Sequence, residues 1–169
     1  MTRLGDVVNI TSGFAFKSEL FNDQGDGEPI IRIRDVGQGS SGTHYSGTYA
    51  EEYVVSKGDL LIAMDGEFRL AEWSGGKALL NQRVCRIEPD LKKIDRRYLL
   101  HLLPRQLKLI EDATPFVTVK HLSVKTIREI ELLLPPLPTQ RRIAAILDKA
   151  QAHVANDRQT LALYDQLAK

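Results

Sequence analysis

The sequence predicts a mixed α+β protein: a β-rich domain with long polar loops and a few helices, followed by a long C-terminal helix of the coiled-coil type. Short apolar runs bounded by turn-forming residues predict the strands, and one stretch with helical spacing predicts a helix inside the domain. Prolines at 135, 136 and 138 then precede residues 139–169, which contain neither glycine nor proline. Proline interrupts a sheet but is tolerated in the first turn of a helix. We therefore expect a domain at residues 1–135 and a helical arm at residues 136–169.

Alternation of apolar and basic side chains is the main strand signal. Residues 29–34 predict a half-buried strand that carries Arg32 and Arg34 on its exposed face. Further strands are expected at residues 7–10, 53–59, 60–64, 78–87 and 127–134, with an extended segment at 116–119. The polar segments at 37–47 and 65–77 are expected to be loops.

One helix is expected within the domain, over residues 95–111, because its apolar side chains fall on one broad face. These side chains are Tyr98, Leu99, Leu102, Leu103, Leu107 and Ile110. Ser123 is a candidate cap for a short helical turn that follows.

The arm has apolar residues at heptad spacing, which is typical of a helix that packs against another helix. The seam consists of Ile143, Leu147, Ala150, Val154, Leu161, Tyr164 and Ala168, with Asp157 as a polar member. About thirty residues at about 1.5 Å each give a helix about 45 Å long, which exceeds a small domain. We interpret it as a spacer and docking arm; the alternative is an amphipathic helix that covers a core. Asp157 either sets the register of a helix pair or marks a solvent-facing break.

Composition is that of an ordinary soluble globular protein, with 43% hydrophobic and 27% charged residues and a net charge of +1. No apolar run has the length of a membrane span, and the N-terminus lacks the apolar core of a signal peptide. The single cysteine, Cys85, lies in an alternating run and fits a buried thiol in a reducing compartment. We expect a cytoplasmic protein that makes no contact with membranes.

No catalytic or metal-binding motif is complete. Residues 37–42 match G-x-G-x-x-G, but no helical pattern follows to bind a pyrophosphate. The four histidines are scattered, without ligands at metal-binding spacing. Residues 89–92 resemble part of a nuclease signature without its second acid, and no asparagine precedes a proline as in DNA amino-methyltransferases. Asp65 and Glu67 are paired acids with no further catalytic group.

What remains are polar loops that interleave basic, amide and aromatic residues on a β-rich frame. Arginine pairs with guanine and asparagine or glutamine with adenine, while lysine and hydroxyl groups suit phosphates. Such loops therefore suit DNA readout, although the same residue types also occur on loops that are merely solvated.

Local signals along nearly the whole chain resemble the target recognition domain of type I restriction–modification specificity subunits. They are residues 3–13 (RLGDVVNITSG), 29–33 (PIIRI), 55–63 (VSKGDLLIA), 81–82 (NQ), 116–123 (FVTVKHLS) and 130–143 (IELLLPPLPTQRRI). Thr139 departs from the pattern, because the family often has glutamate before Gln140.

The resemblance implies a non-catalytic component that reads a half-site in double-stranded DNA and positions a separate methyltransferase subunit. S-adenosylmethionine would then bind only to that partner, and no cofactor or metal is expected on this chain. A complete subunit of the family has two recognition domains separated by two long helices. This chain resembles half of one, and a second copy is expected to pair with it through residues 143–164.

Candidate DNA contacts follow from the resemblance and from side-chain chemistry. Base edges are assigned to Arg69, Gln38 and His44, and phosphates to Lys17, Lys77 and Lys120. Arg34, Tyr45, Trp73 and His121 complete the set. Trp73 either contacts a base or packs in the core. The rival hypothesis is a protein-interaction module that assembles a complex through its arm without contacting DNA.

Overall fold

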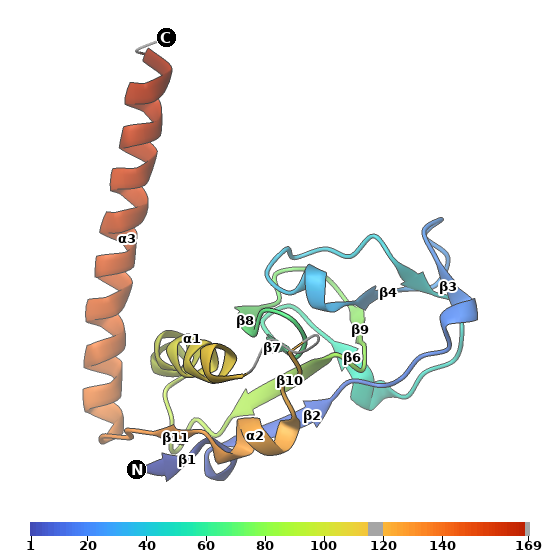
Figure 1. The fold of residues 1–169 in the computed structure, drawn as a ribbon, viewed down its shortest axis with the longest axis horizontal. Helices are drawn as coiled ribbons and strands as arrows, with labels where there is room; N and C mark the ends of the chain where they lie inside the picture. The colour runs from blue at the N-terminus through green and yellow to red at the C-terminus, as the bar shows by residue number, and fades with distance from the viewer. Residues whose placement is uncertain (115–119, 168–169) are drawn as a thin grey trace.

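The computed structural model describes residues 1–114 and 120–167. A β-rich body carries the long helix α3 (Leu137–Leu167), which rises from one end of the body and extends well beyond it (Figure 1). The helix α1 (Arg96–Ala113) lies between α3 and the sheets (Figure 1). This arrangement confirms the predicted α+β class with a long C-terminal helix. No helix in the described part of the chain is long and apolar enough to cross a membrane.

A four-stranded antiparallel sheet forms the centre of the body. In sheet order its strands are β2 (Val8–Ser12), β10 (Val84–Pro89), β7 (Leu60–Ala63) and β8 (Arg69–Glu72). All four residues of β7 are buried, as expected for a short continuous apolar run. Ile87 pairs with Ile10 on one side and with Leu60 on the other, which fixes the register of β2, β10 and β7.

A second, five-stranded sheet is built from shorter strands. In sheet order these are β3 (Phe21–Asn22), β5 (His44–Tyr45), β4 (Glu28–Ile31), β9 (Ala78–Leu80) and β6 (Val54–Val55). β4 and β9 are parallel, and the other neighbouring pairs are antiparallel. Short 3-10 turns, η1 (Leu4–Asp6), η2 (Ser18–Leu20), η3 (Ile33–Asp35) and η4 (Glu51–Tyr53), connect the strands.

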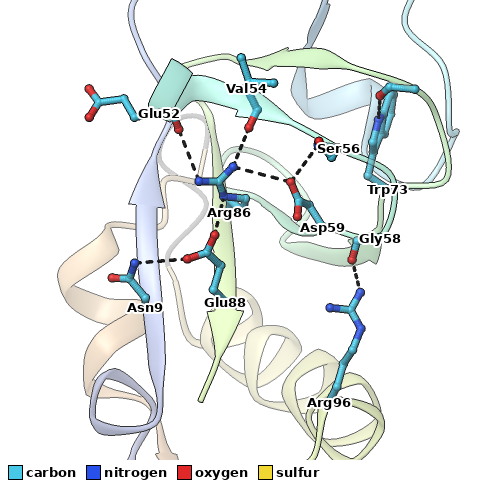
Figure 2. A network of polar contacts seen from close by, with 11 residues as sticks. Asn9, Glu52, Val54, Ser56, Gly58, Asp59, Trp73, Arg86, Glu88 and Arg96 are labelled. Atoms are coloured by element: carbon cyan, nitrogen blue, oxygen red, sulfur yellow. Dashed lines mark hydrogen bonds and ion pairs between the residues drawn. The ribbon is translucent and has the colours of Figure 1, made fainter. Parts of the chain in front are cut away.

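A buried arginine on β10 connects the two sheets (Figure 2). The Arg86 Nη1 donates to the carbonyl of Val54 in β6 at 2.6 Å, and it lies 3.6 Å from the carboxylate of Asp59. Its Nε lies 3.3 Å from Glu88. Because only 15% of the Arg86 side chain is exposed, these partners are needed to offset the cost of burying its charge.

The helix α1 covers the core as its spacing predicts. Asp95 caps its first turn by accepting hydrogen bonds from the backbone N–H of Arg97 and Tyr98. Leu99, Leu103 and Leu107 are fully buried in the main core cluster, together with residues of β2, β7 and β10. Ser123 caps the short helix α2 (Val124–Glu129), in agreement with the prediction.

The first turn of α3 is attached to the body by Gln140, which is only 1% exposed. Its amide nitrogen donates to the carbonyls of Lys93 and Pro135, and its amide oxygen accepts from the backbone N–H of Asp95 at 2.8 Å. About two turns further along, Asp148 lies 2.8 Å from His101 Nε2 and 3.1 Å from Arg97 Nε. A two-stranded ribbon of β1 (Thr2–Arg3) and β11 (Glu131–Leu132) lies beside this attachment (Figure 1).

Three predicted secondary-structure assignments are wrong. Arg32 and Arg34 do not continue a strand, because the Asp35 carboxylate accepts the Arg32 N–H at 2.8 Å and closes the turn η3. The predicted loop at 65–77 contains β8, which pairs with β7 at the edge of the sheet. The predicted strand at 127–134 begins inside α2 and leaves only β11 as strand.

Two further expectations have different outcomes. The predicted strand at 78–87 divides into β9 and β10, because a turn at 81–84 directs them into different sheets. The extended segment expected at 116–119 lies outside the described residues.

Candidate functional site

Three segments meet at one edge of the four-stranded sheet. The turn after β7 binds both others, because Met64 N–H donates to the Arg83 carbonyl and Gly66 N–H donates to the Lys120 carbonyl. Asp65 lies at the centre, with its oxygens 2.6 Å from His121 Nδ1 and 3.3 Å from Arg83 Nε. We call residues 65–69, 81–83 and 120–121 the polar edge. It brings cationic and amide side chains from segments far apart in the sequence onto one surface.

The loop that follows η3 packs on β8 and extends this surface. Arg69 Nη1 donates to the carbonyl of Val36 at 3.1 Å, and its Nη2 pairs with Glu67 at 2.7 Å. Gly39 has a positive φ of 74°, and a Cβ there would lie 2.2 Å from Ser74 Oγ. Glycine therefore permits a close approach that a larger residue would prevent. The predicted contacts Arg34, Gln38 and Arg69 thus belong to one packed region.

The freedom of these side chains to bind a ligand differs. Lys17 and Gln38 are exposed, and no side-chain partner for either occurs within residues 1–114 and 120–167. Arg34 is 62% exposed and donates to Thr43 Oγ1 at 3.2 Å. The ammonium of Lys120 donates to the Glu111 carbonyl, and His121 is 53% exposed beside Asp65. These residues remain candidate contacts.

Two of the predicted contacts are core residues: the assignment of Tyr45 is corrected, and of the two alternatives for Trp73 the structure shows packing in the core. Tyr45 is 5% exposed and packs with Phe16, at a centroid distance of 4.7 Å. Trp73 is 3% exposed, and its indole N–H donates to the Gly76 carbonyl at 2.7 Å. Their rings face inward from the strands and turns that carry them, so neither ring is available to stack on a base.

Lys77 and His44 lie away from the polar edge. Lys77 precedes β9 at the end opposite Asn81, and it binds Tyr49 Oη at 2.8 Å and Glu28 at 3.0 Å. These hydrogen bonds raise the pKa of Lys77, and the same ammonium group lowers the pKa of Glu28. His44 is half-buried on β5, and its buried Nδ1 has no hydrogen-bond partner among the described residues.

A cleft of about 340 Å³ adjoins the polar edge and contains residues that the sequence did not single out as contacts. It is lined by Phe16, Ser18, Phe21, Arg32, Ile33, Asn81, Gln82 and Arg83. We call it the Arg32 cleft. The sequence predicts Arg32 on the exposed face of a strand, and it marks the pair Asn81–Gln82 only as one of the signals of the family resemblance. A basic residue between the buried Ile31 and the partly buried Ile33 is the available signal, but the cleft itself requires three distant segments.

The arm leaves most of its predicted seam uncovered. Ile143 is half-buried against the core, whereas Val154 is 50% exposed and Leu161 is 64% exposed. A groove of about 580 Å³ runs between α1 and α3, and it is lined by His101, Leu147, Ala150, Gln151, Val154, Ala155 and Arg158. Tyr164 and Asp157 are exposed as well. The domain therefore covers only the first turns of α3.

No cluster of histidine, cysteine and acidic residues in the described ranges has the arrangement of a metal site. Cys85 is fully buried, and burial raises the pKa of its thiol to about 12, so it is not a nucleophile at neutral pH. The exposed side chains at and beside the polar edge include cations and amides, together with the carboxylate of Glu67. Such a surface is suited to binding.

Comparison with protein families gives a match to the type I restriction modification DNA specificity domain over residues 1–163. The chain belongs to this family. The specificity subunit of the type I restriction enzyme EcoBI from Escherichia coli is 46% identical over 166 residues, which are 98% of this chain and 35% of that protein. The MjaVIII specificity subunit of Methanocaldococcus jannaschii is 29% identical over 97 residues, covering 57% of this chain and 23% of its own length. The chain thus spans about a third or less of the relatives it matches.

Solved structures of the family share the fold. A chain from a structure of the type I R-M system has a TM-score of 0.74 and 25% identity, covering 95% of this chain and 40% of that one. The HsdS subunit of Thermoanaerobacter tengcongensis has a TM-score of 0.71 and 23% identity, covering 92% and 38%. The resemblance expected from the sequence is confirmed. The boundary between residues 135 and 136 stays a prediction, although α3 begins at Leu137.

Proposed function

We propose that this chain is a non-catalytic specificity component that recognises a short half-site in double-stranded DNA for a type I restriction–modification system. The observation that carries the proposal is the 46% identity to the EcoBI specificity subunit over 98% of the chain. A sequence match over nearly all of the chain includes both the domain and the arm, so the proposal covers both.

The surface of the domain supports this function. Arg69, Gln38 and His121 lie on protruding segments at or beside the polar edge, and their donor and acceptor groups suit base edges in the major groove. Lys17 and Lys120 offer ammonium groups to phosphates. The buried strands beneath these segments hold them in place, which favours a defined register on the duplex.

The arm supports assembly with other chains. We propose that its uncovered apolar residues pack against α3 of a second copy, and that the groove beside α1 accepts helices of the methyltransferase subunit. S-adenosylmethionine would be bound by that partner alone. Pairing of two copies would place two domains at a fixed separation, so that the dimer reads an interrupted symmetric site. A cytoplasmic location belongs to the same proposal.

Selection of bound fragments from a random DNA pool by the purified chain tests the proposal. We expect enrichment of one short sequence, with an affinity that falls steeply as salt rises, because phosphate contacts release counterions. The matched control is the enriched duplex with its central bases exchanged. Failure to enrich any sequence at low salt, combined with retained association with the methyltransferase, would instead support the assembly module that does not read DNA.

A further inference from the structure

We propose that the Arg32 cleft binds one backbone phosphate of the recognised DNA, with the Arg32 guanidinium as its main ligand. This inference rests on the proposed DNA recognition and assigns a role to residues outside the predicted contact set. It assigns a phosphate anchor to the cleft, which shares residues 81–83 with the polar edge, and leaves base reading to the other segments of that edge.

Arg32 differs from the other arginines around the two sheets in having an uncommitted guanidinium. Arg69 is bound to Glu67 and the Val36 carbonyl, Arg86 to Asp59 and Glu88, and Arg96 to Glu72. No hydrogen bond or ion pair to the Arg32 guanidinium occurs within the described residues. Its backbone, in contrast, is fixed by the 2.8 Å hydrogen bond from its N–H to buried Asp35. A half-buried cation with a fixed backbone and no internal partner is suited to an external anion.

The second cation of the cleft is Arg83, which is only partly engaged. Its ion pair with Asp65 uses Nε at 3.3 Å, and 51% of its side chain is exposed. The Asp65 carboxylate also contacts His121, so its negative charge is divided between His121 and Arg83. The residues that line the cleft include two arginines and no aspartate or glutamate. An anion in the cleft therefore meets two guanidinium groups and no lining carboxylate.

The shape of the site favours a phosphate over a base edge. Base edges lie at the floor of the grooves and are reached by protruding segments, whereas phosphates project from the duplex and can enter a hollow. The apolar side chains of Phe16, Phe21 and Ile33 line the same cleft and exclude part of the water. Weaker screening strengthens the attraction between a guanidinium and a phosphate. Lys17, adjacent to Ser18 in the lining, is placed to contact the next phosphate.

The test measures dissociation constants of Arg32→Ala, Arg32→Lys and Arg83→Ala for the selected duplex and for single-base variants, over a range of salt. We expect Arg32→Ala to bind every duplex about 10- to 100-fold more weakly, as for a lost charge-assisted hydrogen bond. Its salt slope should fall by about 1. Arg32→Lys should keep the salt slope because the charge remains. Arg128→Ala, an exposed arginine on α2, is the matched control and should be unchanged.

Replacing single phosphates by neutral methylphosphonates locates the contact. Neutralising one particular phosphate should weaken DNA binding by the wild-type protein and should not weaken binding by Arg32→Ala any further, as in a double-mutant cycle. Circular dichroism checks that each variant is folded. If Arg32→Ala does not fold, the methylphosphonate measurement is made with Arg32→Lys instead. A changed sequence preference in Arg32→Ala, or an unchanged affinity, overturns the phosphate assignment while DNA recognition stands. Absence of binding by the wild-type protein overturns the proposed function itself.

Discussion

The arginines of this protein are distinguished by the groups around them. Arg86 is 15% exposed and surrounded by carbonyls and carboxylates, which makes it part of the internal structure. Arg32 lines a cleft without such partners among the described residues, and this is why we assign it to a ligand. The same reasoning removes Tyr45 and Trp73 from the contact set, because burial leaves their rings no access to DNA.

Glu111 is a buried carboxylate whose protonation should affect stability. It is 9% exposed and accepts a 2.9 Å hydrogen bond from the Phe68 N–H, while Lys108 lies 3.0 Å away. The Phe68 N–H, followed by Lys108, lowers the pKa of Glu111 below its ordinary value of 4.5. The unfolded chain therefore takes up the proton first as pH falls. The stabilisation is complete above pH 4.5 and is lost as pH decreases through the lower folded pKa.

We predict that Glu111→Gln lowers the free energy of unfolding at neutral pH by about 1 kcal/mol, since a charged acceptor becomes neutral. Its stability should also fall less than that of the wild type between neutral pH and pH 3 to 4, a range chosen around the ordinary carboxyl pKa. Urea unfolding at several pH values measures both effects. The control is Glu129→Gln, an exposed carboxylate on α2. Equal pH dependence in Glu111→Gln and wild type would contradict the prediction.

At the scale of elements, the first segment of α3 is attached to the domain and the rest of the helix is exposed. Gln140 and Asp148 attach its first three turns to residues on and beside α1, whereas residues 149–164 are exposed. A helix in water gains most of its stability from the packing of one face, so exposed apolar residues at heptad spacing indicate a missing partner. The attached first segment would then hold that partner at a defined position relative to the domain.

We predict that the wild-type chain self-associates and that Leu161→Glu weakens the dimer by at least about tenfold, equivalent to about 1.4 kcal/mol. A buried, unpaired carboxylate at the seam is the physical reason. Because Leu161 is 64% exposed in the single chain, the thermal midpoint of the monomeric chain should not change. Sedimentation equilibrium measures the association. Gln159→Glu, which adds the same charge off the seam, is the control.

A wild-type chain that remains monomeric at the highest accessible concentration would rule out the homodimer. In that case the arm would be left to helices of the methyltransferase subunit alone.

At the scale of the whole molecule, the polar network around Arg86 connects the two sheets (Figure 2). Beyond Val54, the guanidinium donates to the Glu52 carbonyl, and Asn9 on β2 donates to Glu88 on the same strand as Arg86. Arg96 at the start of α1 reaches the Gly58 carbonyl in the same region. Strands of both sheets and the helix α1 therefore share one set of hydrogen bonds. The position of the Arg32 cleft relative to the arm depends on this network.

We predict that Arg86→Met destabilises the protein by about 2 kcal/mol, because the Val54 carbonyl and the half-buried Asp59 carboxylate lose their charged partner. Amide hydrogen exchange should accelerate more in β6 and β9 than in β2, since β6 is the strand that Arg86 holds. Arg105→Met, on the exposed side of α1, is the control. Uniform acceleration in both sheets, or a change below about 0.5 kcal/mol, would show that the sheets are held together by other contacts.

The sequence by itself determined the fold class, the helix at 95–111, the cap at Ser123, the long C-terminal helix and the family resemblance. These features depend on periodicity, caps and prolines, whose effects act over a few neighbouring residues. Local signals also misled: the alternation at 29–34 predicted one strand, but β4 ends at Ile31 and the Asp35 side chain closes a turn over the remainder.

Only the tertiary structure decided which side chains remain available to a ligand. Tyr45 and Trp73 have side chains of the type that contacts DNA, but distant segments of the chain cover them. Arg32, in contrast, lines a cleft made by residues 16–21, 32–33 and 81–83. Gln140 and Glu111 find their partners 47 and 43 residues away in the chain. Burial and charge pairing are properties of such long-range contacts, and the residue types alone do not specify them.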